Sequence, residues 1–173
     1  MPSWIDSIKS RLRRRGSRSE RADIYDGLRS MALGVDPESL SVPDGEQWSG
    51  AAVAAMELGL GSGTAMIVAI ADGTVSMYVS RGGGIIGSGE HAAVRNAADH
   101  FRTVVAESRD LPEVSGELPR PVAGQVRFHA RKRDGAFSAG APEALLRTGR
   151  HPLAPLYAAG QDLLTEIRLA SPD

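Results

Sequence analysis

Cysteine is absent from this 173-residue chain, so disulfide bonds and thiolate metal sites are excluded. Aromatic residues make up only 5% of the sequence, which leaves few rings on which nucleic-acid bases can stack. Long apolar runs are also missing, because the stretch 65–71 is far shorter than the ~20 residues that span a bilayer. The first residues are polar and basic, unlike a secretory signal. We therefore expect a cytoplasmic protein.

Positive charge is concentrated at the start of the chain. Seven basic and two acidic residues give positions 1–21 a net charge of +5, whereas the whole chain carries −1. A helix over 3–15 would place Trp4, Ile5, Ile8 and Leu12 on one face and basic side chains on much of the rest. We divide the chain into this basic N-terminal arm, 1–21, and a single domain, 22–171.

The arm has three interpretations: weak contact with an anionic membrane, contact with nucleic acid, or a flexible tail. The basic side chains that would make such a contact are Lys9, Arg11, Arg13, Arg14 and Arg15.

Two Asp-Gly pairs predict β-hairpins. Asp72-Gly73 and Asp134-Gly135 each lie between β-rich segments, and a two-residue turn of type I′ needs positive φ at both positions. The alternation of apolar and polar residues over 74–80 predicts a sheet that is covered on one side only. The predicted strands are 49–58, 64–71, 74–80, 126–131 and 136–139.

Helical periodicity predicts three main helices, over 22–33, 90–108 and 153–169, with one or two helical turns within 142–148. The resulting order is α-β-β-β-α-β-β-α. Antiparallel strands with segregated helices predict an α+β two-layer sandwich. We expect a five-stranded, mainly antiparallel sheet with the helices packed on one face.

A glycine-rich loop enters the helix at 90–108. Gly82, Gly84 and Gly87 match the pattern G-x-G-x-x-G, and backbone N–H groups at a helix start bind anions. Arg81 would add a positive charge. The candidate ligand-binding residues are Arg81, Gly82, Gly83, Gly84, Gly87, Ser88, His91 and Arg95.

Three features count against a phosphate at this loop. The preceding strand is the second arm of a hairpin, not the first strand of a parallel βαβ unit. No P-loop lysine follows the glycines, and Glu90 lies in the first helical turn, where it would repel a phosphate. Ser88 is also a good N-cap by itself. The glycines can instead serve a tight strand-to-helix passage, or the loop can contact another protein.

Histidines and a basic strand are the remaining candidates. His91 at the helix start is either a general acid or base or an ordinary exposed side chain, and no nucleophile accompanies it in sequence. No histidine has metal-ligand spacing, so we predict no metal site. The alternating residues Arg127, His129, Arg131 and Arg133 predict a basic stripe opposite the core, either solvated or bound to nucleic acid.

Several segments resemble a family of uncharacterised bacterial proteins. The resemblance lies in the stretch 74–95, with its Ser80-to-Gly87 sequence SRGGGIIG, and in 126–128, 150–153 and 159–161. It covers roughly 48–168 and implies that these parts form one unit. The order of elements is also similar to roadblock and profilin-like folds, which is an analogy of fold only.

We expect a non-enzymatic binding or regulatory module that acts through protein–protein contacts, as a homodimer or with another protein. This expectation rests on the failure to assemble an acid, a base and a nucleophile from the sequence. The alternative is a small anionic ligand or nucleotide bound at 81–91. A third interpretation is an enzyme that uses His91. No cofactor is predicted.

Overall fold

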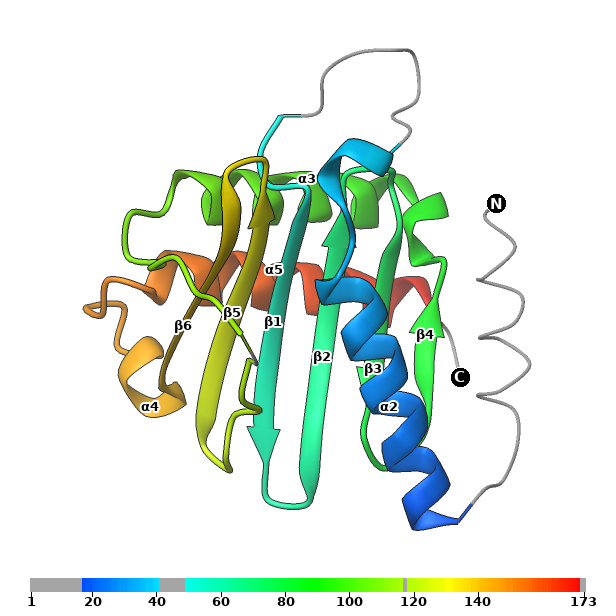
Figure 1. The fold of residues 1–173 in the computed structure, drawn as a ribbon. Coiled ribbons are helices and arrows are strands. Elements are labelled where there is room, and N and C mark those ends of the chain that lie inside the picture. Colours follow the sequence, from blue (N-terminus) through cyan, green and yellow to red (C-terminus); the bar gives the residue numbers. More distant parts are fainter. Residues whose placement is uncertain (1–16, 41–48, 117, 172–173) are drawn as a thin grey trace.

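The computed structural model describes residues 17–40, 49–116 and 118–171 (Figure 1). Its helices are α2 (Arg18–Leu33), α3 (Ala92–Glu107), α4 (Glu143–Leu146) and α5 (Ala154–Ala170), with short 3-10 helices η1 (Pro37–Ser39) and η3 (Ser88–Glu90). The strands are β1 (Val53–Leu60), β2 (Gly63–Ile70), β3 (Val75–Val79), β4 (Gly84–Ile86), β5 (Gln125–Lys132) and β6 (Gly135–Pro142).

All the strands form one antiparallel sheet in the order β4-β3-β2-β1-β5-β6. Both predicted hairpins are confirmed, but neither has the predicted two-residue Asp-Gly turn. Ile70 N donates to the Thr74 carbonyl around a three-residue loop, 71–73, and in the second hairpin Gly135 pairs with Lys132 across a loop of residues 133 and 134. At the first, Gly73 has a φ of 87°, its N–H donates to the Ile70 carbonyl, and Asp72 Oδ1 accepts from Thr74 N at 2.9 Å. The α+β class and the antiparallel sheet predicted from the sequence are therefore correct.

The sheet has six strands instead of the predicted five. The additional strand, β4, lies inside the glycine-rich loop and pairs with β3, with Met77 opposite Ile85. A three-residue strand is too short for apolar alternation to reveal it. Figure 1 shows β4 at one end of the sheet and β6 at the other.

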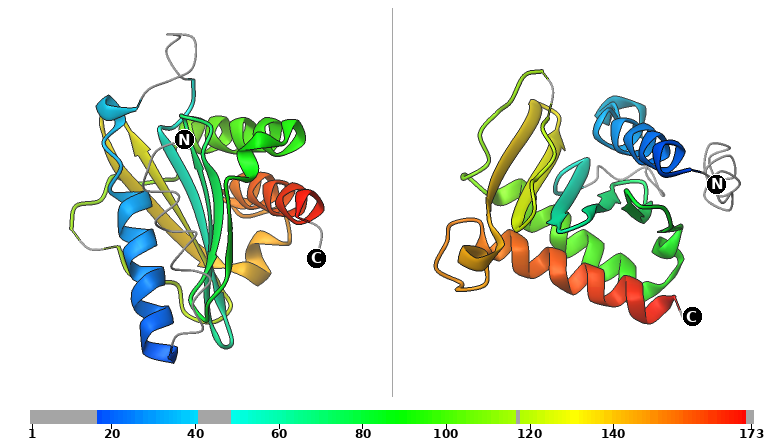
Figure 2. Two further views of the ribbon diagram at one scale, coloured as in Figure 1. Left: turned by 90° about the vertical axis from the view of Figure 1, so that its right-hand side faces the viewer. Right: turned by 90° about the horizontal axis from the view of Figure 1, so that it is seen from below.

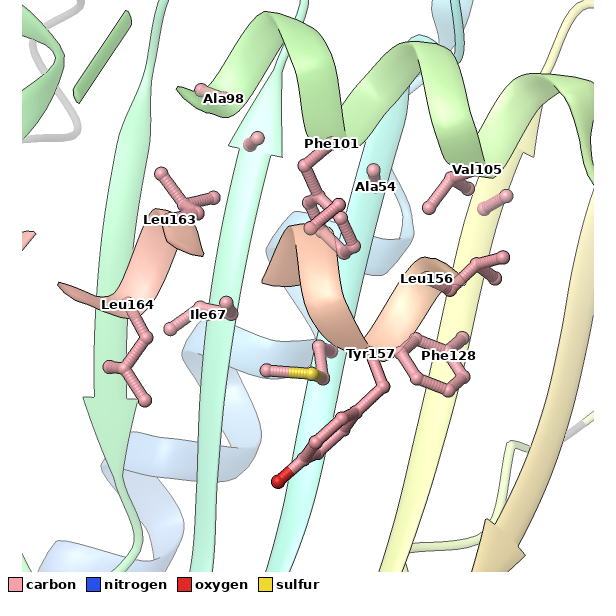
Figure 3. Close-up of a cluster of buried hydrophobic side chains, with 14 of the residues drawn as sticks. Ala54, Ile67, Ala98, Phe101, Val105, Phe128, Leu156, Tyr157, Leu163 and Leu164 are labelled. Atoms are coloured by element: carbon pink, nitrogen blue, oxygen red, sulfur yellow. The ribbon is translucent and has the colours of Figure 1, made fainter. Parts of the chain in front are cut away.

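Helices cover both faces of the sheet, so the predicted packing on one face is wrong. α3 and α5 lie on one face and α2 lies on the other (Figure 2). The first face carries a core that includes Phe101 and Val105 of α3, Leu156 and Leu163 of α5, and Phe128 of β5 (Figure 3). A second cluster, under α2, contains Tyr25, Leu28, Ala32, Val53, Ala55, Met66, Val68, Ile70 and Tyr78.

The burial of the central strands explains why helices cover both faces of the sheet. β1 and β2 are buried at nearly every position and, apart from Glu57 and Thr64, carry apolar residues or glycine on both faces, so both faces need cover. The alternation in β3 was misleading, because its polar-face residues Ser76 and Tyr78 are also buried, under α2.

α2 begins four residues before the predicted start. Ser17 is its N-cap and forms a capping box with Glu20, which satisfies N–H groups at the start of the helix. None of the helices in the described segments is long and apolar enough to cross a membrane.

Candidate functional site

The turn of the β3–β4 hairpin contains Gly82 and Gly83, and the third consecutive glycine, Gly84, begins β4. Gly82 and Gly83 have φ angles of 103° and 92°, a region that L-residues with side chains rarely adopt. The Gly82 N–H donates to the Val79 carbonyl, and the Val79 N–H donates to the Gly83 carbonyl. The turn therefore depends on these glycines for its backbone conformation.

The passage from β4 into α3 uses the other glycines. Gly87 is left-handed, with a φ of 80°, and its N–H donates to the Val75 carbonyl. A Cβ on Gly89 would lie far inside contact distance of the Gly73 carbonyl oxygen. The chain can therefore pass this close to the β2–β3 turn only with glycine at position 89.

Ser88 does not act as the N-cap of α3. It is buried, and its hydroxyl donates to the Val75 carbonyl at 3.3 Å. The N-cap position belongs to His91, whose side chain makes no capping hydrogen bond. Ser88 therefore attaches the loop to β3 and does not face solvent.

His91 and Arg95 lie at the exposed start of α3. Arg95 Nη1 donates to the carbonyl oxygens of Gly89 and Glu90, at 3.0 and 2.7 Å. The guanidinium is thus held against the η3 backbone. The structure brings all the predicted ligand residues to one edge of the sheet, and the proposed anion site there stays a prediction.

The backbone N–H and C=O groups of two β4 residues point away from the sheet. Val79 N donates to Gly83 O and Gly87 N donates to Val75 O, so residues 83 and 87 hydrogen-bond toward β3. The direction alternates along an antiparallel strand, so residue 85 also faces β3, and residues 84 and 86 face outward. We call this row of outward N–H and C=O groups, on Gly84 and Ile86, the β4 edge.

The β4 edge lacks the usual protection of an edge strand. No strand of the described segments lies beyond β4. Its sequence is Gly-Ile-Ile, with neither the charged side chain nor the proline that commonly blocks pairing. Both isoleucines are half-buried, Ile85 against the core under α3 and α5 and Ile86 against the cluster under α2.

The opposite edge of the sheet is partly covered by the chain itself. Val114 N donates to the Ala136 carbonyl at 2.8 Å, and Ser138 N donates to the Pro112 carbonyl at 3.1 Å. The segment 112–114 therefore occupies the middle of the outer side of β6. The two edges of the sheet therefore differ in the backbone groups that remain available for hydrogen bonds with a partner strand.

Charged side chains flank the β4 edge. Arg81 is exposed in the turn, and Arg21 of α2 lies so close that a Cβ on Gly82 would be 2.5 Å from its Cδ. Arg21 Nε is buried and has no hydrogen-bond partner in the described part of the chain. Glu90 is exposed at the other end of β4.

A buried polar network that the sequence analysis missed joins α2 to the sheet. Glu57 of β1 is 0% exposed and accepts hydrogen bonds from Tyr25 Oη at 2.6 Å and from Arg29 Nε at 3.0 Å. His129 Nε2 lies 3.2 Å from the same carboxylate, and Ser138 Oγ lies 3.1 Å from His129 Nδ1. Because a carboxylate only accepts, Nε2 carries the hydrogen and Nδ1 accepts from the Ser138 hydroxyl.

The network determines the charge states of its members. Burial would raise the pKa of Glu57, but hydrogen bonds from His129, Arg29 and Tyr25 outweigh it and lower that pKa. Burial lowers the pKa of His129, with Arg29 and Arg127 acting in the same direction against Glu57. Glu57 is therefore held ionised and the imidazole neutral. The pair is buried beneath α2, where it holds that helix in place on the sheet.

Of the predicted basic stripe, Arg133 alone is exposed, just beyond the end of β5. His129 is 1% exposed, and Arg127 and Arg131 are half-buried. Arg29 Nη2 also donates to the Leu118 carbonyl at 2.8 Å, which brings the connection before β5 over this side of the sheet. A glutamate inside the apolar run of β1 was the available signal, because a charge at a buried strand position needs partners.

Metal ligands are not grouped in the described segments, which contain no cluster of three or more His, Asp or Glu side chains. The basic residues Lys9, Arg11, Arg13, Arg14 and Arg15 lie outside the described residues. Comparison with protein families, curated proteins and solved structures found no match.

Proposed function

We propose that the protein is a binding module that acts through protein–protein contacts at its β4 edge. The observation that carries this proposal is the outward row of backbone groups on Gly84 and Ile86, which no described residue pairs. An extended segment of another chain can add to such an edge, because main-chain hydrogen bonds supply affinity without a particular sequence.

The surroundings of the edge support binding over catalysis. The buried acid–base pair of Glu57 and His129 is engaged in the network under α2. His91 is exposed and takes part in none of the ion pairs found among the described residues. Two half-buried isoleucines flank the edge, one on each face of the sheet, and give a docked strand apolar contacts.

Selection from a library of displayed 12-residue peptides tests the proposal, with Ile86→Pro as the diagnostic variant. The Ile86 N–H faces outward, so proline removes a donor to a partner without removing a bond to β3. We expect selected peptides to bind the wild-type chain and to lose at least about tenfold in affinity for Ile86→Pro. Ile86→Val, which keeps the N–H, is the matched control. Peptides that bind Ile86→Pro as well as the wild type would count against the β4 edge.

A second candidate function is binding of a small anion at the β3–β4 turn. The observation that favours it is Arg21, whose Nε lacks a hydrogen-bond partner in the described segments and lies against Gly82, beside the exposed Arg81. Phosphate oxygens accept well from guanidinium groups and from backbone N–H groups of glycine turns.

Thermal melting with inorganic phosphate and with ATP separates this candidate from the first. An anion bound here raises the melting temperature with the logarithm of its concentration above the dissociation constant. Arg21→Gln removes the rise, whereas the exposed, distant Arg150→Gln keeps it. Equal behaviour of the two variants would exclude a site at the turn.

A further inference from the structure

We infer that the partner at the β4 edge is a second copy of this chain, in a two-fold dimer whose sheet runs continuously from one copy into the other. This inference rests on the proposed function and adds the identity of the partner. Three features of β4 carry it: the phase of its hydrogen bonds, the small side chains along it, and the charges at its ends.

The outward backbone groups of β4 can pair with the same groups of a second copy related by a two-fold axis. An axis perpendicular to the sheet at residue 85 sets two β4 strands antiparallel, with Gly84 of each copy opposite Ile86 of the other. Both of these residues point their N–H and C=O outward. Each Gly84–Ile86 pair then exchanges two backbone hydrogen bonds, and the two Ile85 residues form the closely spaced, non-bonded pair between them.

The side chains along the strand permit this approach. Gly84 has no side chain, and neither isoleucine bears a charge that another copy would have to bury. Ile85 lies on the face covered by α3 and α5. Its pairing with the same residue of a second copy would extend an apolar core across the junction.

The ends of the strand carry opposite charges. An antiparallel arrangement sets the turn of one copy beside the residues that follow β4 in the other, which brings Arg81 near Glu90 at both ends of the junction. Both side chains are exposed. Arg21 also lies at the end of β4 that carries the turn. Arg95 lies at the end that carries Glu90, where its Nη1 already donates to the carbonyl oxygens of residues 89 and 90.

The short strand also sets the strength of the association. Three residues and the flanking turn bury much less than the roughly 1,200 Å² of a stable interface. We therefore expect a weak dimer, with a dissociation constant in the range of about 10 μM to 1 mM.

Sedimentation velocity of the full chain, from about 1 μM to about 1 mM, tests this inference. The wild-type chain should pass from monomer to dimer over this range. Ile86→Pro should stay monomeric, and Ile86→Val should dimerise like the wild type.

A charge exchange tests the pairing of Arg81 with Glu90. Arg81→Glu alone and Glu90→Arg alone should each weaken dimerisation by about fivefold, and the double variant should recover most of the loss. Thermal melting of each variant identifies any that fails to fold. A dimer that ignores both the proline and the charge exchange would place the junction elsewhere and overturn the inference.

These experiments distinguish a failure of the dimer from a failure of the proposed function. A wild-type chain that stays monomeric at every concentration overturns the second copy as partner. Peptides that still depend on the Ile86 N–H would leave the β4 edge as a binding site for another protein. Peptides that do not depend on it would overturn the proposed function as well.

Discussion

At the residue scale, Glu57 is the most consequential side chain outside the apolar core. It is a fully buried carboxylate with Tyr25, Arg29 and His129 around it. A buried ion pair adds little net stability compared with apolar packing, but removing one partner leaves the others unpaired and desolvated. The network therefore fixes where α2 sits more than it strengthens the fold.

Replacing Glu57 by glutamine tests this role. The amide keeps the volume but cannot satisfy Arg29 and His129 as an anion, so we expect unfolding to become easier by about 3 kcal/mol. Glu143→Gln is the control, because the amide oxygen can still accept from Tyr157 Oη and only the pairing with the exposed Arg147 is lost, which should cost about 1 kcal/mol or less. Urea titration measures both, and equal losses would show that burial of Glu57 is unimportant.

The network also predicts how stability depends on pH. His129 has a folded pKa below its ordinary value of 6.5, so the unfolded chain binds the additional proton as the pH falls below 6.5 and stability drops. Glu57 has a folded pKa below 4.5, so its contribution is present above pH 4.5 and is lost as the pH falls further. Urea unfolding should show a smaller free energy at pH 5.5 than at pH 7.5, and His129→Gln should reduce this difference. A wild-type stability that does not change over this range would contradict the neutral imidazole.

Residue types reveal such a network only in part. The sequence shows a glutamate within an apolar strand and a histidine on another strand, 72 residues apart. Their pairing depends on β1 and β5 being neighbours in the sheet, with His129 opposite Ala55, and on α2 lying above them. Neither condition follows from spacing along the chain.

At the element scale, the sequence predicted the elements that depend on contacts between residues close together in the chain. The two hairpins and the long amphipathic helix α3 were found because their signals lie within a few residues of each other. The placement of α2 and the existence of β4 were missed. Both depend on neighbours distant in sequence: the second apolar face of β1 and β2 for α2, and the outer side of β3 for β4.

The passage between β4 and α3 gives an element-scale prediction. Gly89→Ala would push a Cβ against the Gly73 carbonyl, so we expect a loss of about 2–4 kcal/mol in the free energy of unfolding. Gly61→Ala is the matched control, because a Cβ there meets nothing within 4 Å and the expected change is below about 1 kcal/mol. Thermal melting compares the two. A harmless Gly89→Ala would mean that the loop does not need its close approach to the β2–β3 turn.

At the scale of the whole molecule, the sheet is covered on both faces and partly along β6, and the β4 edge is the side left open by the described residues. The sequence analysis singled out the glycine-rich loop, which is also the region that contains β4. The sequence left a structural passage, a ligand site and a protein contact open there, because a glycine pattern looks the same whether its N–H groups face an anion or its strand faces a partner chain. The hydrogen-bond direction of residues 83 and 87 is what makes a protein contact the better-supported function.

Residue-by-residue hydrogen exchange at the β4 edge tests the central claim most directly. In the dilute full chain, the outward amides of Gly84 and Ile86 should exchange quickly, while the inward amides of Ile85 and Gly87 are protected by β3. Occupying the edge, by concentrating the chain or by adding a selected peptide, should slow exchange at Gly84 and Ile86 by about tenfold or more and leave Ile85 and Gly87 unchanged. Exchange at Gly84 and Ile86 that stays equally fast in both states would contradict the account.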